Sequence, residues 1–133
     1  MKRLSAFLAC LTLAASASAA EIPKVSPADA AARAAAGQAI LVDVREPAEW
    51  AENGVAAPAV LLPMSDLNGE RKLWKPFLEK NAGKEIILYC RSGNRSGKVA
   101  EKLSAEGRKV ANAGAFKDWT AAGLPTRRPD AQP

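Results

Sequence analysis

The sequence contains no histidine and only two cysteines, Cys10 and Cys90, among its 133 residues. Without histidine, no imidazole is present to activate a cysteine nucleophile, and a zinc site would lack ligands. A dithiol redox site of the C-x-x-C type is also excluded, because the two cysteines lie far apart in the chain. Any thiol chemistry must therefore depend on one cysteine that a group other than imidazole activates.

The charge balance and the absence of long apolar runs exclude further classes of partner. The formal net charge is +5, from 19 basic and 14 acidic residues, and the basic residues are scattered rather than clustered. We therefore expect no nucleic-acid partner. No apolar run reaches the roughly 20 residues that cross a bilayer, so stable membrane insertion is not expected either.

Residues 1–20 have the layout of a secretory signal peptide. Two basic residues are followed by an apolar run over residues 4–15 and then by small residues. An uncleaved anchor would need a longer run, and a lipid-modified Cys10 fits less well because Cys10 lies before that run ends. We therefore expect export to the periplasm, which leaves Cys90 as a single thiol in a compartment where disulfides normally form.

The rest of the chain alternates apolar runs with amphipathic segments, as one domain over residues 25–126. We expect strands at 39–44, 59–63, 85–89 and 109–114, and helices at 26–37, 46–54, 64–83 (interrupted by Gly69 and Pro76), 94–107 and 115–123. This alternation predicts an α/β fold with an open parallel sheet and helices on both faces. Residues 127–133 are polar and contain proline, and a flexible tail is expected there.

Cys90 ends the apolar run "EIILY" and opens the segment "CRSGNRS", which leads into a helix. Ligands of open parallel sheets bind beyond the carboxyl ends of the strands, so this is the expected site. The glycine lets the backbone curl into a nest of N–H groups at the positive end of the helix. Arg91 and Arg95 add fixed charge that lowers a thiol pKa and binds oxyanions. The alternative is an inert core cysteine beside a solvated basic surface.

A cysteine phosphatase remains an enzymatic alternative, because those enzymes also place a cysteine and an arginine in a loop before a helix. They space the two residues as C-x5-R. Here Arg95 gives C-x4-R, and Ser96 occupies the position of the phosphatase arginine. The spacing therefore favours another thiol chemistry.

Three motifs, "LVDVREPAEW", "YCRSGNRSGKVAEKLSAEG" and "AFKDWTAAGLP", together resemble a single-domain rhodanese, a sulfurtransferase. The small size and the leader are similar to the exported phage-shock-protein-E type. The resemblance implies a rhodanese-like domain in which Cys90 accepts sulfur as a persulfide, without a cofactor or a metal. The substrate would bind to the loop that follows Cys90, formed by Arg91, Ser92, Gly93, Asn94 and Arg95.

The resemblance also implies the substrates and the supporting residues. The donor would be thiosulfate or a similar small anion, and the acceptor cyanide, a thiol or a protein; a persulfide carrier without steady turnover is the alternative. Asp43 and Arg45 would support the loop, while Trp50 and Trp119 are expected in the core. The family often has "GHIPGA" where this chain has "GVAAPA", a departure that bears on substrate preference rather than on the cysteine loop.

The leader generates the first prediction. The mature protein should begin at Ala20 or Glu21 and be recovered from the periplasmic fraction, because the charged start, short apolar run and small-residue end direct cleavage there. N-terminal sequencing of the recovered protein measures this. A mature chain that still begins with Met1 would contradict the prediction.

Overall fold

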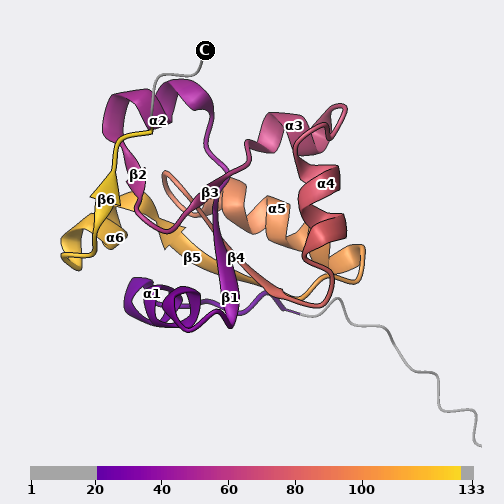
Figure 1. Ribbon diagram of the computed structural model, residues 1–133, viewed down its shortest axis with the longest axis horizontal. Coiled ribbons are helices and arrows are strands. Elements are labelled where there is room, and N and C mark those ends of the chain that lie inside the picture. Colours follow the sequence, from indigo (N-terminus) through magenta and orange to yellow (C-terminus); the bar gives the residue numbers. More distant parts are fainter. Residues whose placement is uncertain (1–20, 130–133) are drawn as a thin grey trace, which may run out of the picture.

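A four-stranded parallel sheet forms the centre of the molecule in the computed structural model, which describes residues 21–129 (Figure 1). Its strands are β1 (Ala39–Asp43), β3 (Val60–Leu61), β4 (Glu85–Cys90) and β5 (Val110–Ala115). A separate two-stranded sheet consists of β2 (Val55–Ala56) and β6 (Thr126–Arg127). The helices are α1 (Pro27–Ala35), α2 (Pro47–Asn53), α3 (Met64–Asn68), α4 (Trp74–Lys80), α5 (Asn94–Ala105) and α6 (Phe116–Ala121). The strand order β3-β1-β4-β5 confirms the expected open parallel sheet. The expected signal peptide lies outside the described residues.

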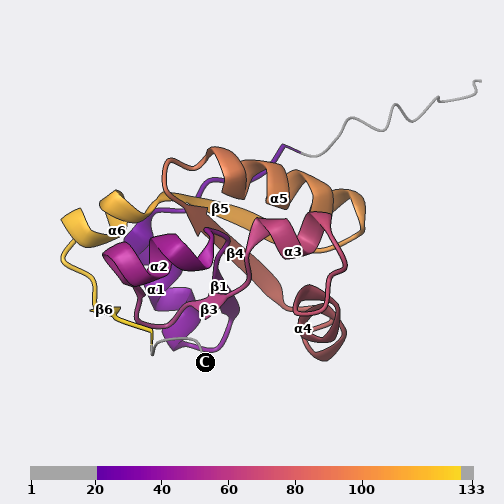
Figure 2. The same ribbon diagram turned by 90° about the horizontal axis from the view of Figure 1, so that it is seen from above.

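Helices cover both faces of the sheet, as the alternation in the sequence predicts (Figure 2). The side chains of β4 alternate between the two faces. Ile86, Leu88 and Cys90 pack with residues of α3, α4 and α5, whereas Ile87 and Tyr89 pack with residues of α1 and α6. Because both faces are buried, β4 is a continuous apolar run that ends at the cysteine.

Two expectations about local structure are wrong. The flexible tail was expected from residue 127, but Arg127 belongs to β6, which pairs with β2 in an antiparallel ladder, and its guanidinium donates to the carbonyls of Ala57 and Ala59. The part of the expected tail at 130–133 lies outside the described residues. Pro76 does not interrupt a helix, because it is the third residue of α4, where its missing N–H would have no intrahelical acceptor.

The start of α4 is set by a side chain that the sequence pattern does not reveal. The Asp66 carboxylate accepts hydrogen bonds from the backbone N–H groups of Lys72, Leu73 and Trp74, at 2.9 to 3.0 Å. These are donors that a helix start otherwise leaves without a partner.

No helix within residues 21–129 combines the length and the apolar character that a bilayer crossing requires.

A buried ion pair lies where β1 ends. Arg45 and Asp43 are 1% and 0% exposed, and an Arg45 terminal nitrogen lies 2.8 Å from Asp43 Oδ2. The same nitrogen donates to the carbonyl of Gly54 at 2.7 Å, and the guanidinium carbon lies 4.4 Å from the ring centroid of Phe116. Arg45 therefore connects the end of β1 with the end of α2 and the start of α6.

This ion pair generates the second prediction. Arg45→Ala should lower the free energy of unfolding by about 3–5 kcal/mol, because it leaves the Asp43 charge buried without a partner. The control is Arg33→Ala, which removes a pair with Glu85 in which the arginine side chain is 39% exposed. That change should cost at most about 1 kcal/mol. Urea unfolding measures both variants, and equal losses would contradict the assigned role of Arg45.

Candidate active site

Cys90 is the last residue of β4, and its side chain is fully buried. The segment Arg91–Gly93 follows, and α5 begins at Asn94. Cys90 therefore lies at the carboxyl end of the parallel sheet, where the sequence predicts the site. Its side chain points to the face of the sheet that α5 covers.

Two donors reach the sulfur of Cys90. The backbone N–H of Gly93 donates to Sγ at 3.0 Å, and the hydroxyl of Ser96 lies 3.4 Å from Sγ. Gly93 has φ +92°, a conformation that favours glycine, and a Cβ there would come within 3.3 Å of Gly114 Cα. The turn that points this N–H at the sulfur therefore depends on glycine at position 93.

The surroundings of Cys90 favour its thiolate. Burial by itself would raise the pKa of the Cys90 thiol. The hydrogen bonds from the Ser96 hydroxyl and the Gly93 N–H, together with the nearby backbone N–H groups of Ser96 and Ser92, more than offset this, and the pKa of Cys90 lies below its ordinary value. The loop thus activates the thiol without an imidazole.

Asn112 of β5 supports this loop, although the sequence pattern did not predict it as a site residue. Its Nδ2 donates to the carbonyl of Gly93 at 3.1 Å, and its Oδ1 accepts from the Ser96 hydroxyl at 2.8 Å and from the N–H of Gly114 at 2.9 Å. The Ser96 hydroxyl has one hydrogen, so Asn112 and Cys90 compete for it. A polar residue within the predicted strand "KVANAG" was the signal that could have revealed Asn112.

Arg95 is paired with Glu49, a second residue that the sequence pattern did not predict at the site. Its terminal nitrogens lie 2.6 and 2.8 Å from the two carboxylate oxygens of Glu49, and the pKa of Glu49 is lowered chiefly by this hydrogen bonding. Glu49 also accepts from the backbone N–H of Glu46 at the start of α2. Arg95 therefore connects α5 to α2.

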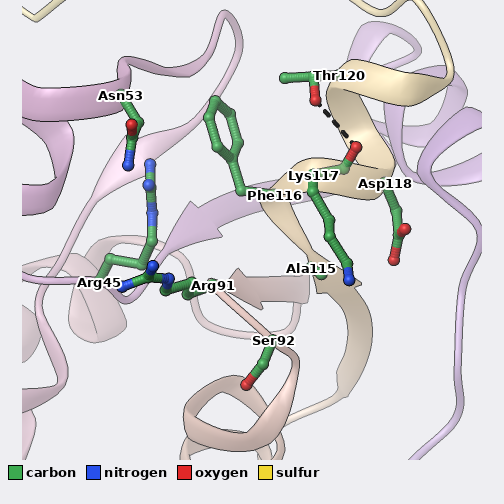
Figure 3. Close-up of a pocket in the computed structure, with 9 residues that line it drawn as sticks. All are labelled: Arg45, Asn53, Arg91, Ser92, Ala115, Phe116, Lys117, Asp118 and Thr120. Carbon is green, nitrogen blue, oxygen red and sulfur yellow. Dashed lines mark hydrogen bonds between the residues drawn. The ribbon is translucent and has the colours of Figure 1, made fainter.

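Arg91 and Ser92 are exposed and line a pocket of about 620 Å³ beside the loop (Figure 3). The pocket is lined by Arg45, Asn53, Arg91, Ser92, Ala115, Phe116, Lys117, Asp118 and Thr120. A smaller pocket of about 360 Å³ lies on another side of Ser92, and Gly93, Asn112 and Lys24 contribute to it. The buried Cys90 sulfur lines neither of these two pockets.

The remaining predicted residues have structural positions. Asn94 is the exposed first residue of α5, and its N–H lies 3.5 Å from Ser92 Oγ. Asp43 holds Arg45, which forms part of the pocket wall. Trp50 and Trp119 are buried, which confirms their expected core packing. Among residues 21–129, no three side chains of the metal-binding types come together.

The fold and the loop define a class: α/β domains with one activated thiol between a parallel strand and a helix. A family model described as the rhodanese-like domain matches residues 26–122. The chain belongs to the rhodanese-like domain family, which confirms the resemblance seen in its motifs. This membership supports a sulfurtransferase-type or related activity.

Two relatives illustrate the similarity in sequence. An uncharacterized protein of Synechocystis is 39% identical over 89 residues, which cover 65% of this chain and 46% of the relative. A thiosulfate:glutathione sulfurtransferase of Saccharomyces cerevisiae is 30% identical over 95 residues, which cover 63% of this chain and 66% of the relative. The chain thus spans from about half to about two thirds of the length of these relatives.

Solved structures show the same fold. A rhodanese-related protein of Thermoplasma volcanium has a TM-score of 0.66 at 26% identity, covering 80% of this chain and 99% of that one. A protein of unknown function from Rhodopseudomonas palustris, described as a possible tyrosine phosphatase, has a TM-score of 0.66 at 25% identity, covering 80% and 85%. These matches confirm the α/β fold with helices flanking a parallel sheet.

The hydrogen bond from Ser96 generates the third prediction. Ser96→Ala removes a donor to the thiolate, so the pKa of Cys90 should rise and its alkylation by iodoacetamide should shift to higher pH. The expected rise in the midpoint is about one pH unit, since such a bond to a charged group contributes about 1.5 kcal/mol at the weak end.

Ser92→Ala is the matched control. It also removes a loop hydroxyl, but Ser92 acts on the sulfur through its backbone N–H, which the substitution keeps. Its alkylation midpoint should match that of the wild type. A midpoint that is the same in all three proteins would show that the Ser96 hydroxyl does not stabilise the thiolate.

Proposed function

We propose that this protein transfers a sulfane sulfur from thiosulfate, or a similar small anionic donor, to a thiophilic acceptor through a persulfide on Cys90. One observation carries the proposal: the Cys90 sulfur receives hydrogen bonds from Gly93 and Ser96 at the start of α5, and its pKa is lowered. A thiolate is the nucleophile that attack on a sulfur–sulfur bond requires.

In the first step, the Cys90 thiolate attacks the outer sulfur of thiosulfate. A bond forms between the two sulfurs, the sulfur–sulfur bond of the donor breaks, and its electron pair leaves with sulfite. The product is a persulfide anion on Cys90. The N–H groups of the loop would also stabilise the charge of this anion.

In the second step, an acceptor takes the outer sulfur and the Cys90 thiolate returns. Division into two steps through a covalent intermediate predicts ping-pong kinetics. Cyanide, a thiol and a protein are the candidate acceptors. The name of the yeast relative pairs thiosulfate with glutathione, which supports a thiol.

The two loop arginines have different parts in this scheme. Arg91 is exposed at the pocket and is available to attract the anionic donor. Arg95 is paired with Glu49, and its charge beside Cys90 adds to the positive potential of the loop. An anionic donor that contacts Arg95 directly has to displace one of its bonds to Glu49.

A cysteine phosphatase or arsenate-type enzyme is the second candidate, and the R. palustris structure is the observation that favours it. The loop argues against it, because Cys90 to Arg95 spans six residues and the buried Ser96 takes the position of the phosphatase arginine. A persulfide carrier without turnover is the third candidate. Export to the periplasm remains part of the proposal.

The persulfide generates the fourth prediction. Wild-type protein incubated with thiosulfate should gain one sulfur atom by mass spectrometry and turn over thiosulfate with cyanide. Cys90→Ser should do neither, because a hydroxyl of nearly the same size cannot become a persulfide, while its circular dichroism should match the wild type. A wild type that gains no sulfur but hydrolyses a phosphate ester would favour the phosphatase. A wild type that gains sulfur without turnover would favour the carrier.

A further inference from the structure

The 620 Å³ pocket beside the loop contains two cations without protein partners. Within residues 21–129, neither the Arg91 nor the Lys117 side chain makes an ion pair or a hydrogen bond to another residue. Arg45 also lines the pocket, but Asp43 neutralises its charge. Asp118 is the one carboxylate in the lining, so positive charge is in excess.

The arrangement of these side chains suits an organic anion. In Figure 3, Arg45 and Arg91 lie on one side of the pocket, Lys117 and Asp118 lie on the other, and Phe116 extends between them. Phe116 and Ala115 give the pocket an apolar portion. Its volume of about 620 Å³ lies within the range of about 300–1,000 Å³ that is usual for small-molecule sites, and greatly exceeds the size of cyanide or thiosulfate.

The pocket also lies next to the thiol. Cys90 and Ala115 are paired residues of the β4–β5 ladder, and Ala115 lines the pocket. Ser92, two residues after Cys90, lines it as well. A molecule in the pocket therefore lies at the edge of the loop that covers the sulfur.

We propose that this pocket binds the sulfur acceptor and that the acceptor is an organic thiol bearing carboxylates, which Lys117 and Arg91 recognise. This inference rests on the proposed function. The acceptor thiolate attacks the outer sulfur of the Cys90 persulfide, and a new sulfur–sulfur bond forms on the acceptor. The bond between Sγ and the outer sulfur breaks, its electron pair returns to Cys90, and an organic persulfide leaves. The transfer needs no further oxidant or reductant.

A substitution at Lys117 tests the acceptor pocket more cleanly than one at Arg91. Arg91 is also available to the anionic sulfur donor in the first step, so a change there would affect both steps. Lys24 offers a matched control, since it lines the smaller pocket that shares Ser92 and Asp118 with the larger one. Lys117→Glu and Lys24→Glu make the same change of charge on the two sides. Lys117→Arg keeps the charge and serves as the conservative variant.

The experiment isolates the second step. Protein loaded with sulfur from thiosulfate is freed of the donor and mixed with mercaptosuccinate, which carries two carboxylates, or with neutral 2-mercaptoethanol. Loss of the persulfide gives a rate constant for each thiol. The ratio of the two rate constants within one variant removes the difference in intrinsic reactivity between the thiols.

Lys117→Glu should lower the mercaptosuccinate to 2-mercaptoethanol ratio by about tenfold to a hundredfold, the range expected when a charge-assisted contact is lost. Lys117→Arg and Lys24→Glu should keep the ratio of the wild type. An unchanged ratio in Lys117→Glu, or an equal fall in Lys24→Glu, would overturn the acceptor pocket while the proposed function stands. A wild type that takes no sulfur from thiosulfate would instead overturn the proposed function, and this inference with it.

Discussion

A thiolate buried at the end of a parallel strand needs hydrogen-bond donors in place of the water that it has lost, and most of the site follows from this requirement. Burial opposes the thiolate, so donors have to be supplied from the immediate surroundings. The chain supplies them from the turn at Gly93, from the first turn of α5 and from the Ser96 hydroxyl. Arg95 lies close enough to Cys90 for their charges to interact, and no side-chain base takes part. The absence of histidine is thus consistent with an activated cysteine.

The loop that provides these donors is fixed from two directions. Asn112 holds it from β5 through the carbonyl of Gly93 and through Ser96. Glu49 holds it from α2 through both terminal nitrogens of Arg95. α2 is itself fixed to the end of β1, because the buried Arg45 donates to the carbonyl of Gly54. A change at any of these contacts is therefore expected to act on the sulfur indirectly, by displacing the donors rather than by removing them.

The sequence predicted the features that depend on local pattern. Apolar runs and caps revealed the α/β fold, and the position of Cys90 between a strand and a helix revealed the site. The contacts of Asn112 and Glu49 were not predictable, because they join residues far apart in the chain, and a single asparagine or glutamate indicates no particular partner. The prediction of a flexible tail failed at Arg127 for the same reason. The polar composition of this segment does not reveal that it pairs with β2. The prediction that Pro76 interrupts a helix was wrong because a proline is compatible with the first turn of a helix.

The same residue that steadies the loop also joins it to the beginning of the described chain. Asn112 accepts a backbone hydrogen bond from Val25 and donates one to Pro23. The consequence for folding is that the chemistry depends on contacts of large sequence separation, whose formation has to offset the entropy cost of closing a long loop. In the unfolded chain Cys90 has none of these donors and the ordinary reactivity of a thiol. The lowered pKa of the Cys90 thiol is therefore a property of the folded chain rather than of the sequence around Cys90.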